Sequence, residues 1–271
     1  MKDIKTYNVI AQEGLDELPA DMYTVNKSTK PDALLIRSQD MHKTPFGTSV
    51  LAIARAGAGV NNIPLEKATS QGTAVFNTPG SNANAVKELI ITMLLLSVRP
   101  VFASVKWAQK LAGADVSLQT EKGKNHFAGT ELYGKKIGII GLGNIGSRVA
   151  KACMDLGMKV IGYDPYISVE KAWQLSNDIP RAESLEELLE QSDFITIHIP
   201  YTDKNRNIIG EDEINVMKDT AVLLNYSRWG IVDEDAVIKA LNAKKLRLFI
   251  TDFSSEKILN HKLDMPLFYC I

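Results

Sequence analysis

The feature that most restricts the fold of this chain is a short apolar run that passes directly into a glycine-rich turn. Residues 136–146 read KIGIIGLGNIG, and one helix length later residues 159–164 read KVIGYD. A strand, a G-x-G-x-x-G turn, a helix and a second strand ending in an acid together form the dinucleotide-binding fingerprint. The sequence therefore predicts a βαβ unit that binds a nucleotide at the carboxyl ends of its strands.

Each glycine of the turn has its own physical reason. Gly141 permits the tight turn, Gly143 lets the backbone approach a pyrophosphate, and Gly146 lets the helix pack closely against the sheet. With Asn144 and Ile145, these glycines form the predicted pyrophosphate site, where free N–H groups and the helix dipole favour an anion.

The acid at the end of the second strand indicates which dinucleotide binds. Asp164 lies eighteen residues after Gly146. At that position a carboxylate can accept hydrogen bonds from both ribose hydroxyls and repel a 2′-phosphate. The predicted cofactor is therefore NAD rather than NADP.

Length and charge limit the possible partners. The chain has 271 residues, 45% of them hydrophobic, and a formal net charge of −1, so we expect two packed domains that bind a small molecule rather than nucleic acid or a membrane. Cys153 and Cys270 give neither a disulfide framework nor a metal-binding spacing, and no metal is expected. Because no leader and no apolar run of ~20 residues is seen, the predicted location is the cytoplasm.

Short apolar runs alternate with helical patterns along the whole chain, as is typical of α/β domains with parallel sheets. One series of expected strands covers residues 8–10, 33–36, 50–54 and 74–76, and a second covers 137–140, 160–163, 194–199, 221–224 and 246–250. Helices are expected at 65–71, at 84–97 and from 101 to about 111. The polar, glycine-rich residues 113–134 suggest a connecting loop or arm, and the predicted domains are 1–97 and 98–271.

Polar side chains follow several strands of the second series. Open parallel sheets bind ligands at the carboxyl ends of their strands. The candidate ligand-binding residues there are His198, Pro200, Asn225, Arg228, Asp252 and Glu256.

In combination, the fingerprint and these residues resemble the D-isomer-specific 2-hydroxyacid dehydrogenases. Residues 36–38 (IRS), 55–63 (RAGAGVNNI) and 77–82 (NTPGSN) resemble the phosphoglycerate dehydrogenase branch of that family, in a short form without a regulatory domain. The resemblance implies two doubly wound parallel-sheet domains, a flavodoxin-like substrate domain and a Rossmann NAD-binding domain. It also implies NAD-dependent oxidation of 3-phosphoglycerate, the step that opens serine biosynthesis, by a homodimer.

The resemblance also assigns roles to individual residues of this chain. Arg228 would grip the substrate carboxylate and keto oxygen, and Glu256 would orient a catalytic histidine. Asp252 would hold the nicotinamide carboxamide, while His198 and Pro200, with Asn225 nearby, would line the cofactor cleft. On the substrate side, the N–H groups of Ala58 and Gly59 would bind the carboxylate, and Arg37, Ser38 and Asn82 the phosphate.

Two departures from the family pattern affect the expected chemistry. Trp229 follows Arg228 where the family usually has glycine. The family's acid/base histidine directly follows a proline, but here Leu267 follows Pro266. His261 is a poor substitute because it comes only five positions after Glu256. The early end of the chain predicts an incomplete last strand, an uncovered apolar face and reduced turnover.

Three functions therefore remain open at the level of sequence. The first is phosphoglycerate oxidation, and the second is the same chemistry on glyoxylate, hydroxypyruvate or another small 2-keto acid. The third is a protein that binds NAD(H) without catalysis and senses redox state; the missing histidine favours it, whereas Arg228 and Glu256 disfavour it.

Overall fold

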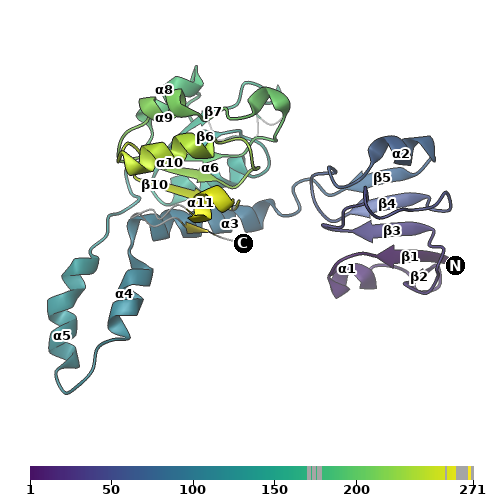
Figure 1. Ribbon diagram of the computed structural model, residues 1–271, viewed down its shortest axis with the longest axis horizontal. Helices are drawn as coiled ribbons and strands as arrows, with labels where there is room; N and C mark the ends of the chain where they lie inside the picture. The colour runs from purple at the N-terminus through teal and green to yellow at the C-terminus, as the bar shows by residue number, and fades with distance from the viewer. Residues whose placement is uncertain (170–171, 173–174, 176–178, 254, 261–267, 270–271) are drawn as a thin grey trace. The chain divides into compact units, whose positions relative to one another are not determined.

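The protein is described by a computed structural model that covers residues 1–169, 172, 175, 179–253, 255–260 and 268–269. The chain divides into two compact units, Met1–Asn82 (unit 1) and Ala83–Ile271 (unit 2). Figure 1 shows a separate sheet in each unit.

Unit 1 is built on a parallel sheet with the strand order β2-β1-β3-β4-β5. This is the flavodoxin-like order, with a switch point between β1 and β3. Its strands are β1 (Lys2–Thr6), β2 (Tyr23–Val25), β3 (Ala33–Ile36), β4 (Ala52–Arg55) and β5 (Ala74–Asn77), and its helices are α1 (Gln12–Asp16) and α2 (Leu65–Ser70).

The buried cluster of unit 1 lies on one face of its sheet. Side chains alternate between the two faces of a strand, and Leu34, Ile36 and Ile53 point into the cluster that also contains Ala68 of α2. The opposite face carries small or partly exposed apolar residues in two registered rows, Ala33-Ala52-Ala74 and Leu35-Ala54-Phe76. Phe76 in the second row is 59% exposed.

The first strand of unit 1 differs from the prediction. We expected a strand at residues 8–10, but the strand is Lys2–Thr6, and Val9 is 84% exposed. The apolar run at 8–10 misled the prediction because the true strand reads Lys-Asp-Ile-Lys-Thr. Its Asp3 is buried, where it accepts hydrogen bonds from Thr24 Oγ1 and the Lys27 N–H.

Unit 2 contains a six-stranded parallel sheet in the order β11-β10-β9-β8-β6-β7. An isolated parallel bridge between Gly162 and Arg181 adds a short extra pairing beside β7, which completes the Rossmann order around β6. The strands are β6 (Lys136–Ile140), β7 (Lys159–Tyr163), β8 (Phe194–Ile197), β9 (Val222–Asn225), β10 (Leu248–Thr251) and β11 (Phe268–Tyr269).

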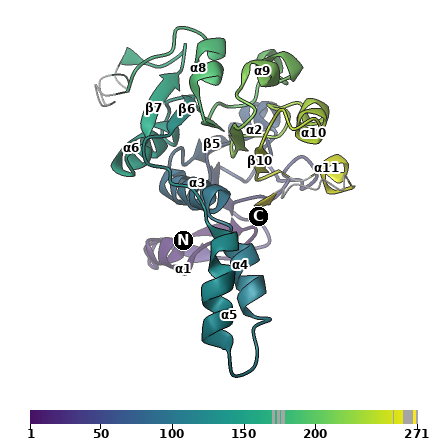
Figure 2. The ribbon, with the colours of Figure 1, turned by 90° about the vertical axis from the view of Figure 1, so that its left-hand side faces the viewer.

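Helices cover both faces of this sheet, so the predicted doubly wound fold is confirmed. On one face the buried cluster includes residues of α3 (Ala83–Val98) and α6 (Gly146–Asp155). On the other face it includes residues of α8 (Leu185–Gln191), α9 (Glu211–Val216), α10 (Glu234–Asn242) and α11 (Glu256–Asn260), while the short helix η2 covers Asp203–Asn205. Figure 2 shows α6 and α8 on either side of β6 and β7.

The division between the units lies before α3, whereas we predicted it near residue 97 or 98. The reason is the packing of α3, whose Ile90, Met93 and Leu94 are buried in the same cluster as Val149 of α6 and Ile137 of β6. Helix α3 is thus part of the core of unit 2 rather than a connection between domains.

The helix predicted from residue 101 is present, and the predicted loop or arm 113–134 contains a second helix that forms a hairpin with it. The hairpin, or arm, consists of α4 (Val101–Ala108), α5 (Val116–Gly123) and the 3₁₀ turn η1 (Lys124–Phe127), and it extends away from the sheet of unit 2 in Figures 1 and 2. The rings of Trp107 and Phe127 lie 5.2 Å apart between its two limbs. Gly123 makes this packing possible, because a Cβ there would overlap the Trp107 ring.

Among the described residues no single helix could cross a membrane. Helices α3 and α4 reach the required length and apolarity only together, as a pair bent by 64°.

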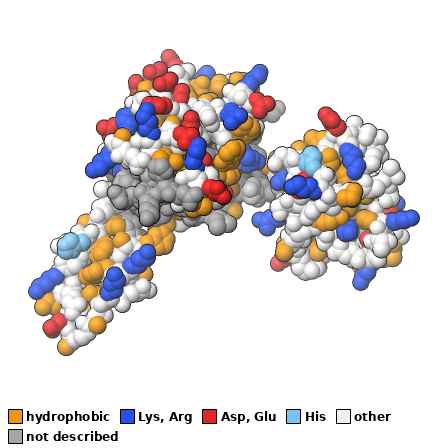
Figure 3. Space-filling view, viewed as in Figure 1, with side chains coloured by type: hydrophobic (Ala, Val, Ile, Leu, Met, Phe, Trp, Pro, Cys, Tyr) orange, Lys and Arg blue, Asp and Glu red, His pale blue; other side chains and the backbone are white. Residues whose placement is uncertain are grey.

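Figure 3 shows apolar side chains along the arm.

Candidate functional site

The glycine-rich turn joins β6 to α6 at the carboxyl edge of the unit 2 sheet. Gly141 has a φ of +91°, and a Cβ there would lie 2.8 Å from the carbonyl oxygen of His198. A Cβ on Gly146 would overlap the carbonyl oxygen of Gly141. The conformation and packing of the protein itself therefore require these two glycines.

Gly143 differs from the other two glycines. A Cβ added there would meet no protein atom within 4 Å, so the packing of the chain does not explain the absence of a side chain. The open approach to its backbone, in front of the N-terminus of the ten-residue helix α6, suits a pyrophosphate. The residues of this turn fit a dinucleotide.

Asp164 immediately follows β7, next to β6 in the sheet. Its Oδ2 accepts a hydrogen bond from the N–H of Leu142, inside the glycine-rich turn, at 2.9 Å, and its Oδ1 accepts one from the N–H of Tyr166 at 3.1 Å. A carboxylate has about four lone-pair sites, so roughly two remain for ribose hydroxyls. Asp164 thus both fixes the turn and keeps acceptors for a ligand.

His198 follows β8, and its environment keeps the imidazole neutral. Burial lowers the pKa of His198 from 6.5 to about 3. Its Nε2 lies 3.0 Å from Thr196 Oγ1, and its buried Nδ1 has no hydrogen-bond partner among the described residues. An imidazole with so low a pKa is a poor general base at neutral pH, so His198 does not replace the family's acid/base histidine.

Asn225 ends β9 and organises the turn that carries Arg228. Its Oδ1 accepts hydrogen bonds from the N–H and the hydroxyl of Ser227, at 3.2 and 2.9 Å, and its Nδ2 donates to the carbonyl of Arg228 at 3.0 Å. The side chain predicted to contact the cofactor is therefore engaged in shaping this turn. Arg228 is exposed and donates from Nη1 to the carbonyl of Ser227 at 2.7 Å, and Trp229 beside it is 61% exposed.

The last predicted polar residues lie after β10. The N–H of Asp252 donates to the carbonyl of Asn225 at 3.2 Å, and partial burial raises the pKa of the Asp252 carboxyl. Glu256 is the exposed first residue of α11, beside Ser255, whose hydroxyl donates to Glu234 at 2.7 Å. The residues His261, Pro266 and Leu267 lie outside the described residues.

Because β7, β6, β8, β9 and β10 are neighbours and parallel, their carboxyl ends form one edge. The structure therefore brings together, along that edge, Asp164, the turn 141–146, His198, Pro200, Asn225, Arg228 and Asp252.

In unit 1, the predicted carboxylate-binding loop follows β4. The carbonyl of Ala58 accepts from Asn77 Nδ2 at 2.6 Å, and the carbonyl of Gly59 accepts from Arg55 Nη1. The N–H groups of Ala58 and Gly59 donate to no protein group in the described part of the chain. The side chains of Asn77 and Arg55 thus bind the two carbonyls, and the N–H groups of Ala58 and Gly59 remain as donors for an anion.

The predicted phosphate-binding residues lie on the same edge of the unit 1 sheet. Arg37 and Ser38 follow β3, both exposed, and the N–H of Ser38 donates to Asn8 Oδ1 at 2.9 Å. The carbonyl of Arg37 accepts from Arg55 Nε at 3.1 Å. Asn82 is exposed after β5 and ends unit 1.

The sequence analysis missed the residues that support this loop. Arg55, Asn77 and Thr78 stand at or just after strand ends, and Thr78 Oγ1 accepts from the N–H of Gly57 at 2.9 Å. Their position was a usable signal, but a hydrogen bond from a side chain to a backbone in a neighbouring loop has no fixed sequence spacing.

Comparison with known proteins agrees with this geometry. Residues 101–269 match the family model described as D-isomer specific 2-hydroxyacid dehydrogenase, NAD binding domain. The chain belongs to this family. Unit 2 of this D-2-hydroxyacid dehydrogenase family member is accordingly its NAD-binding domain.

Named relatives include two kinds of enzyme. The chain is 37% identical over 239 residues to a D-3-phosphoglycerate dehydrogenase of Methanocaldococcus jannaschii, which covers 88% of this chain and 42% of that protein. It is 36% identical to a hydroxypyruvate reductase of Thermotoga maritima, over 83% of this chain and 66% of that protein. The chain thus spans about two fifths of the length of the first relative.

Solved structures show the same architecture. The chain superposes with a TM-score of 0.68 and 26% identity on a D-lactate dehydrogenase of Aquifex aeolicus complexed with NAD and lactic acid. The match covers 95% of this chain and 79% of that one.

Proposed function

We propose that this chain uses NAD to oxidise a small D-2-hydroxy acid. The observation that carries the proposal is the Asp164 carboxylate, hydrogen-bonded to the Leu142 N–H beside the open backbone of Gly143. Bound NAD would accept the hydride from the substrate carbon. The turn 141–146 would hold its pyrophosphate, and Asp164 its ribose.

Arg228 and Glu256 are the proposed catalytic residues. A guanidinium is always charged and has five N–H donors. In Arg228, Nη1 donates to the carbonyl of Ser227. The remaining donors of Arg228 suit the carboxylate and the carbonyl oxygen of a 2-keto acid. From the family resemblance, Glu256, exposed at the start of α11, would orient a catalytic histidine that takes the hydroxyl proton; no described residue is assigned as that proton acceptor.

The proposed substrate is 3-phosphoglycerate, whose oxidation to 3-phosphohydroxypyruvate opens serine biosynthesis. The phosphoglycerate dehydrogenase relative and the exposed Arg37 support it. The two N–H donors of Ala58 and Gly59 would bind the substrate carboxylate, and Arg37, Ser38 and Asn82 its phosphate.

Turnover on phosphorylated and unphosphorylated acids tests the substrate. Arg37→Ala should lower kcat/KM for 3-phosphoglycerate by about tenfold or more, because it removes a charge-assisted hydrogen bond, and leave hydroxypyruvate reduction unchanged. Arg206→Ala, at an exposed arginine of unit 2, is the matched control. An equal loss on both acids would favour a small unphosphorylated substrate, as the hydroxypyruvate reductase relative suggests.

A specific observation keeps a second function in view. Leu267 follows Pro266 where the family has its acid/base histidine, and His198, whose pKa burial lowers to about 3, is a poor base at neutral pH. A protein that binds NAD(H) and senses redox state needs no base. Tight NADH binding in a fluorescence titration, with no NADH formed from any 2-hydroxy acid, would reject the enzyme and leave the non-catalytic NAD(H)-binding function.

We also propose a homodimer formed through the arm. Val101, Phe102 and Val105 of α4 are 43%, 56% and 48% exposed, and Leu118 of α5 is 53% exposed. Exposed apolar patches of this kind mark interaction surfaces. In sedimentation velocity, Val105→Asp should yield monomers, while Gln109→Asp, which adds the same charge at an exposed position of the arm, should stay dimeric.

A further inference from the structure

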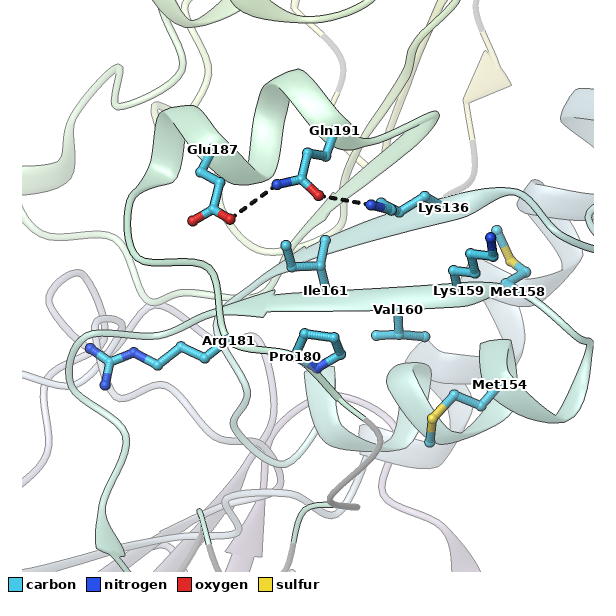
Figure 4. A pocket seen from close by; sticks show the side chains of 10 residues that line it. All are labelled: Lys136, Met154, Met158, Lys159, Val160, Ile161, Pro180, Arg181, Glu187 and Gln191. Carbon is cyan, nitrogen blue, oxygen red and sulfur yellow. Dashed lines mark hydrogen bonds between the residues drawn. The ribbon is translucent and has the colours of Figure 1, made fainter.

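The amino ends of β6 and β7 border a second pocket, at the opposite edge of the sheet from the glycine-rich turn. Its volume is about 570 Å³, within the usual range for small-molecule sites. Neither the glycine-rich turn 141–146 and Asp164 nor the substrate residues discussed above line it. Figure 4 shows it at the outer edge of β7, the last full strand on this side of the sheet.

The walls of the pocket are apolar on both sides of this edge. Ile161 faces the α8 side, while Val160 faces Met154 of α6 and Pro180 on the other side (Figure 4). Methionine adapts to irregular ligands. Val160 and Ile161 are each 5% exposed, so a hydrocarbon body of a few atoms would bury apolar surface against the half-buried Met154 and the exposed Pro180.

Positive charges gather at the rim. Lys136 and Lys159 are the first residues of β6 and β7 and stand directly in register, so their side chains leave the same face of neighbouring strands. Like charges placed opposite each other across a strand pair are destabilising. Arg181, which follows Pro180, adds a third cation to the lining.

The one carboxylate in the lining forms no ion pair with these cations in the described part of the chain. Glu187 accepts from Gln191 Nε2 at 3.0 Å and from the N–H of Glu183 at 2.7 Å, while its own N–H donates to Ser184 Oγ. Ser184 is thus the N-cap of α8, and Glu187 at its N3 position is bonded to the N–H just before that cap. The Lys136 ammonium donates to the neutral oxygen of Gln191 at 2.7 Å (Figure 4).

We propose that this pocket binds an amphipathic anion, a molecule with a carboxylate or phosphate head and a short apolar body. The head lies between Lys136 and Lys159 on the α8 face of the sheet, where it relieves their mutual repulsion, and the body passes around the outer edge of β7 onto the exposed Pro180. The site is separate from the cofactor edge and does not depend on the proposed dehydrogenase function.

Calorimetric titration of the full chain, saturated with NADH, tests the proposal. The probes are octanoate, octyl phosphate and the neutral octanol. We expect one of the two anions, or both, to bind at least tenfold more tightly than octanol, and the tighter anion identifies the head group. Octanol binding as tightly as both anions would overturn the proposal, because the charges would then play no part.

Substitutions of Lys159 at the rim test whether the anion binds in this pocket. Lys159→Gln should weaken the anion about tenfold, since a charge-assisted hydrogen bond is lost, and Lys159→Arg should restore it. Lys151→Gln, which removes an exposed lysine of α6 that pairs with Asp155, is the matched control and should leave binding unchanged. Unaltered affinity in Lys159→Gln would refute the site, and so would displacement of the anion by added NADH.

Discussion

Asp164 shows how one side chain can serve the protein and a ligand at once. Its two hydrogen bonds from backbone N–H groups stabilise the charged carboxylate and lock the glycine-rich turn to the end of β7. The same charge repels a 2′-phosphate. Cofactor affinity and cofactor choice therefore depend on one residue.

Substitution of this residue should change both properties. Asp164→Ala should raise the Kd of NADH about tenfold or more, since hydrogen bonds to a charged group contribute about 1.5–3 kcal/mol each, while NADPH binding should weaken less or improve. Fluorescence titration with the two nucleotides measures the ratio. Asp155→Ala, an exposed aspartate of α6, should alter neither Kd, and an unchanged ratio in Asp164→Ala would contradict the assignment.

His198 should make the stability of the fold dependent on pH. Its folded pKa of about 3 lies below its unfolded value of 6.5, so the unfolded chain binds more protons between these values, and stability falls as the pH falls through 6.5. At pH 5 the loss is about 2 kcal/mol relative to pH 8, from ~1.36 kcal/mol per pKa unit.

Denaturant unfolding of His198→Gln at both pH values measures this effect. The variant should lose most of the difference between pH 8 and pH 5, whereas His126→Gln, an exposed histidine of the arm, should keep it. Carboxyl groups with a lowered pKa, such as Asp32 beside Lys2, respond only below the ordinary value of 3.8. An equal pH dependence in wild type and His198→Gln would mean that the imidazole is protonated in the fold.

At the scale of elements, the strands of unit 2 and the glycine-rich turn could be predicted from the sequence, because apolar runs and glycine spacing mark them directly. The buried strands of unit 2 are continuous apolar runs, and β6, β7, β9 and β10 lie within two residues of their expected bounds. The failures have physical causes. Strand β1 carries charges that its neighbours satisfy. The polar pattern of residues 113–134 hid α5, which packs against Trp107 of α4 at Gly123, and these two residues are far apart in the sequence.

The arm should be sensitive to a single methyl group. A Cβ at residue 123 overlaps the Trp107 ring, so Gly123→Ala should separate α5 from α4 and loosen the backbone beside the exposed Lys106 and Lys122. Limited trypsin digestion should then cut the arm several times faster than in the wild type. Gly14→Ala, where a Cβ meets nothing within 4 Å, is the control, and an equally resistant arm in Gly123→Ala would show that this packing is not needed.

At the scale of the whole molecule, the two units differ in the size of their buried hydrophobic clusters. The described cluster of unit 1 has eight members on one sheet face, whereas unit 2 has clusters of twenty-two and nineteen on its two faces. The sequence predicted two parallel sheets but not this inequality, because Ala33, Ala52 and Ala74 are apolar whether or not anything covers them.

Hydrogen exchange should show that the sheet of unit 1, with its smaller buried cluster, is less protected than the sheet of unit 2. Segments with few buried contacts open at lower free energy, so amides of β3 and β4 should exchange faster than those of β6 and β8 at the same pH. Mass spectrometry of peptic peptides measures this in the intact chain. Equal protection in the two sheets would show that something else stabilises unit 1.

The strand pair β6–β7 separates Lys136 and Lys159 at one end from the glycine-rich turn and Asp164 at the other. Five residues at roughly 3.3 Å each span roughly 16 Å, about twice the Debye length of ~8 Å at physiological ionic strength. Mobile ions in cell-like buffer therefore shield each end from the charge at the other. An anion at the lysines would influence the dinucleotide electrostatically only in dilute salt.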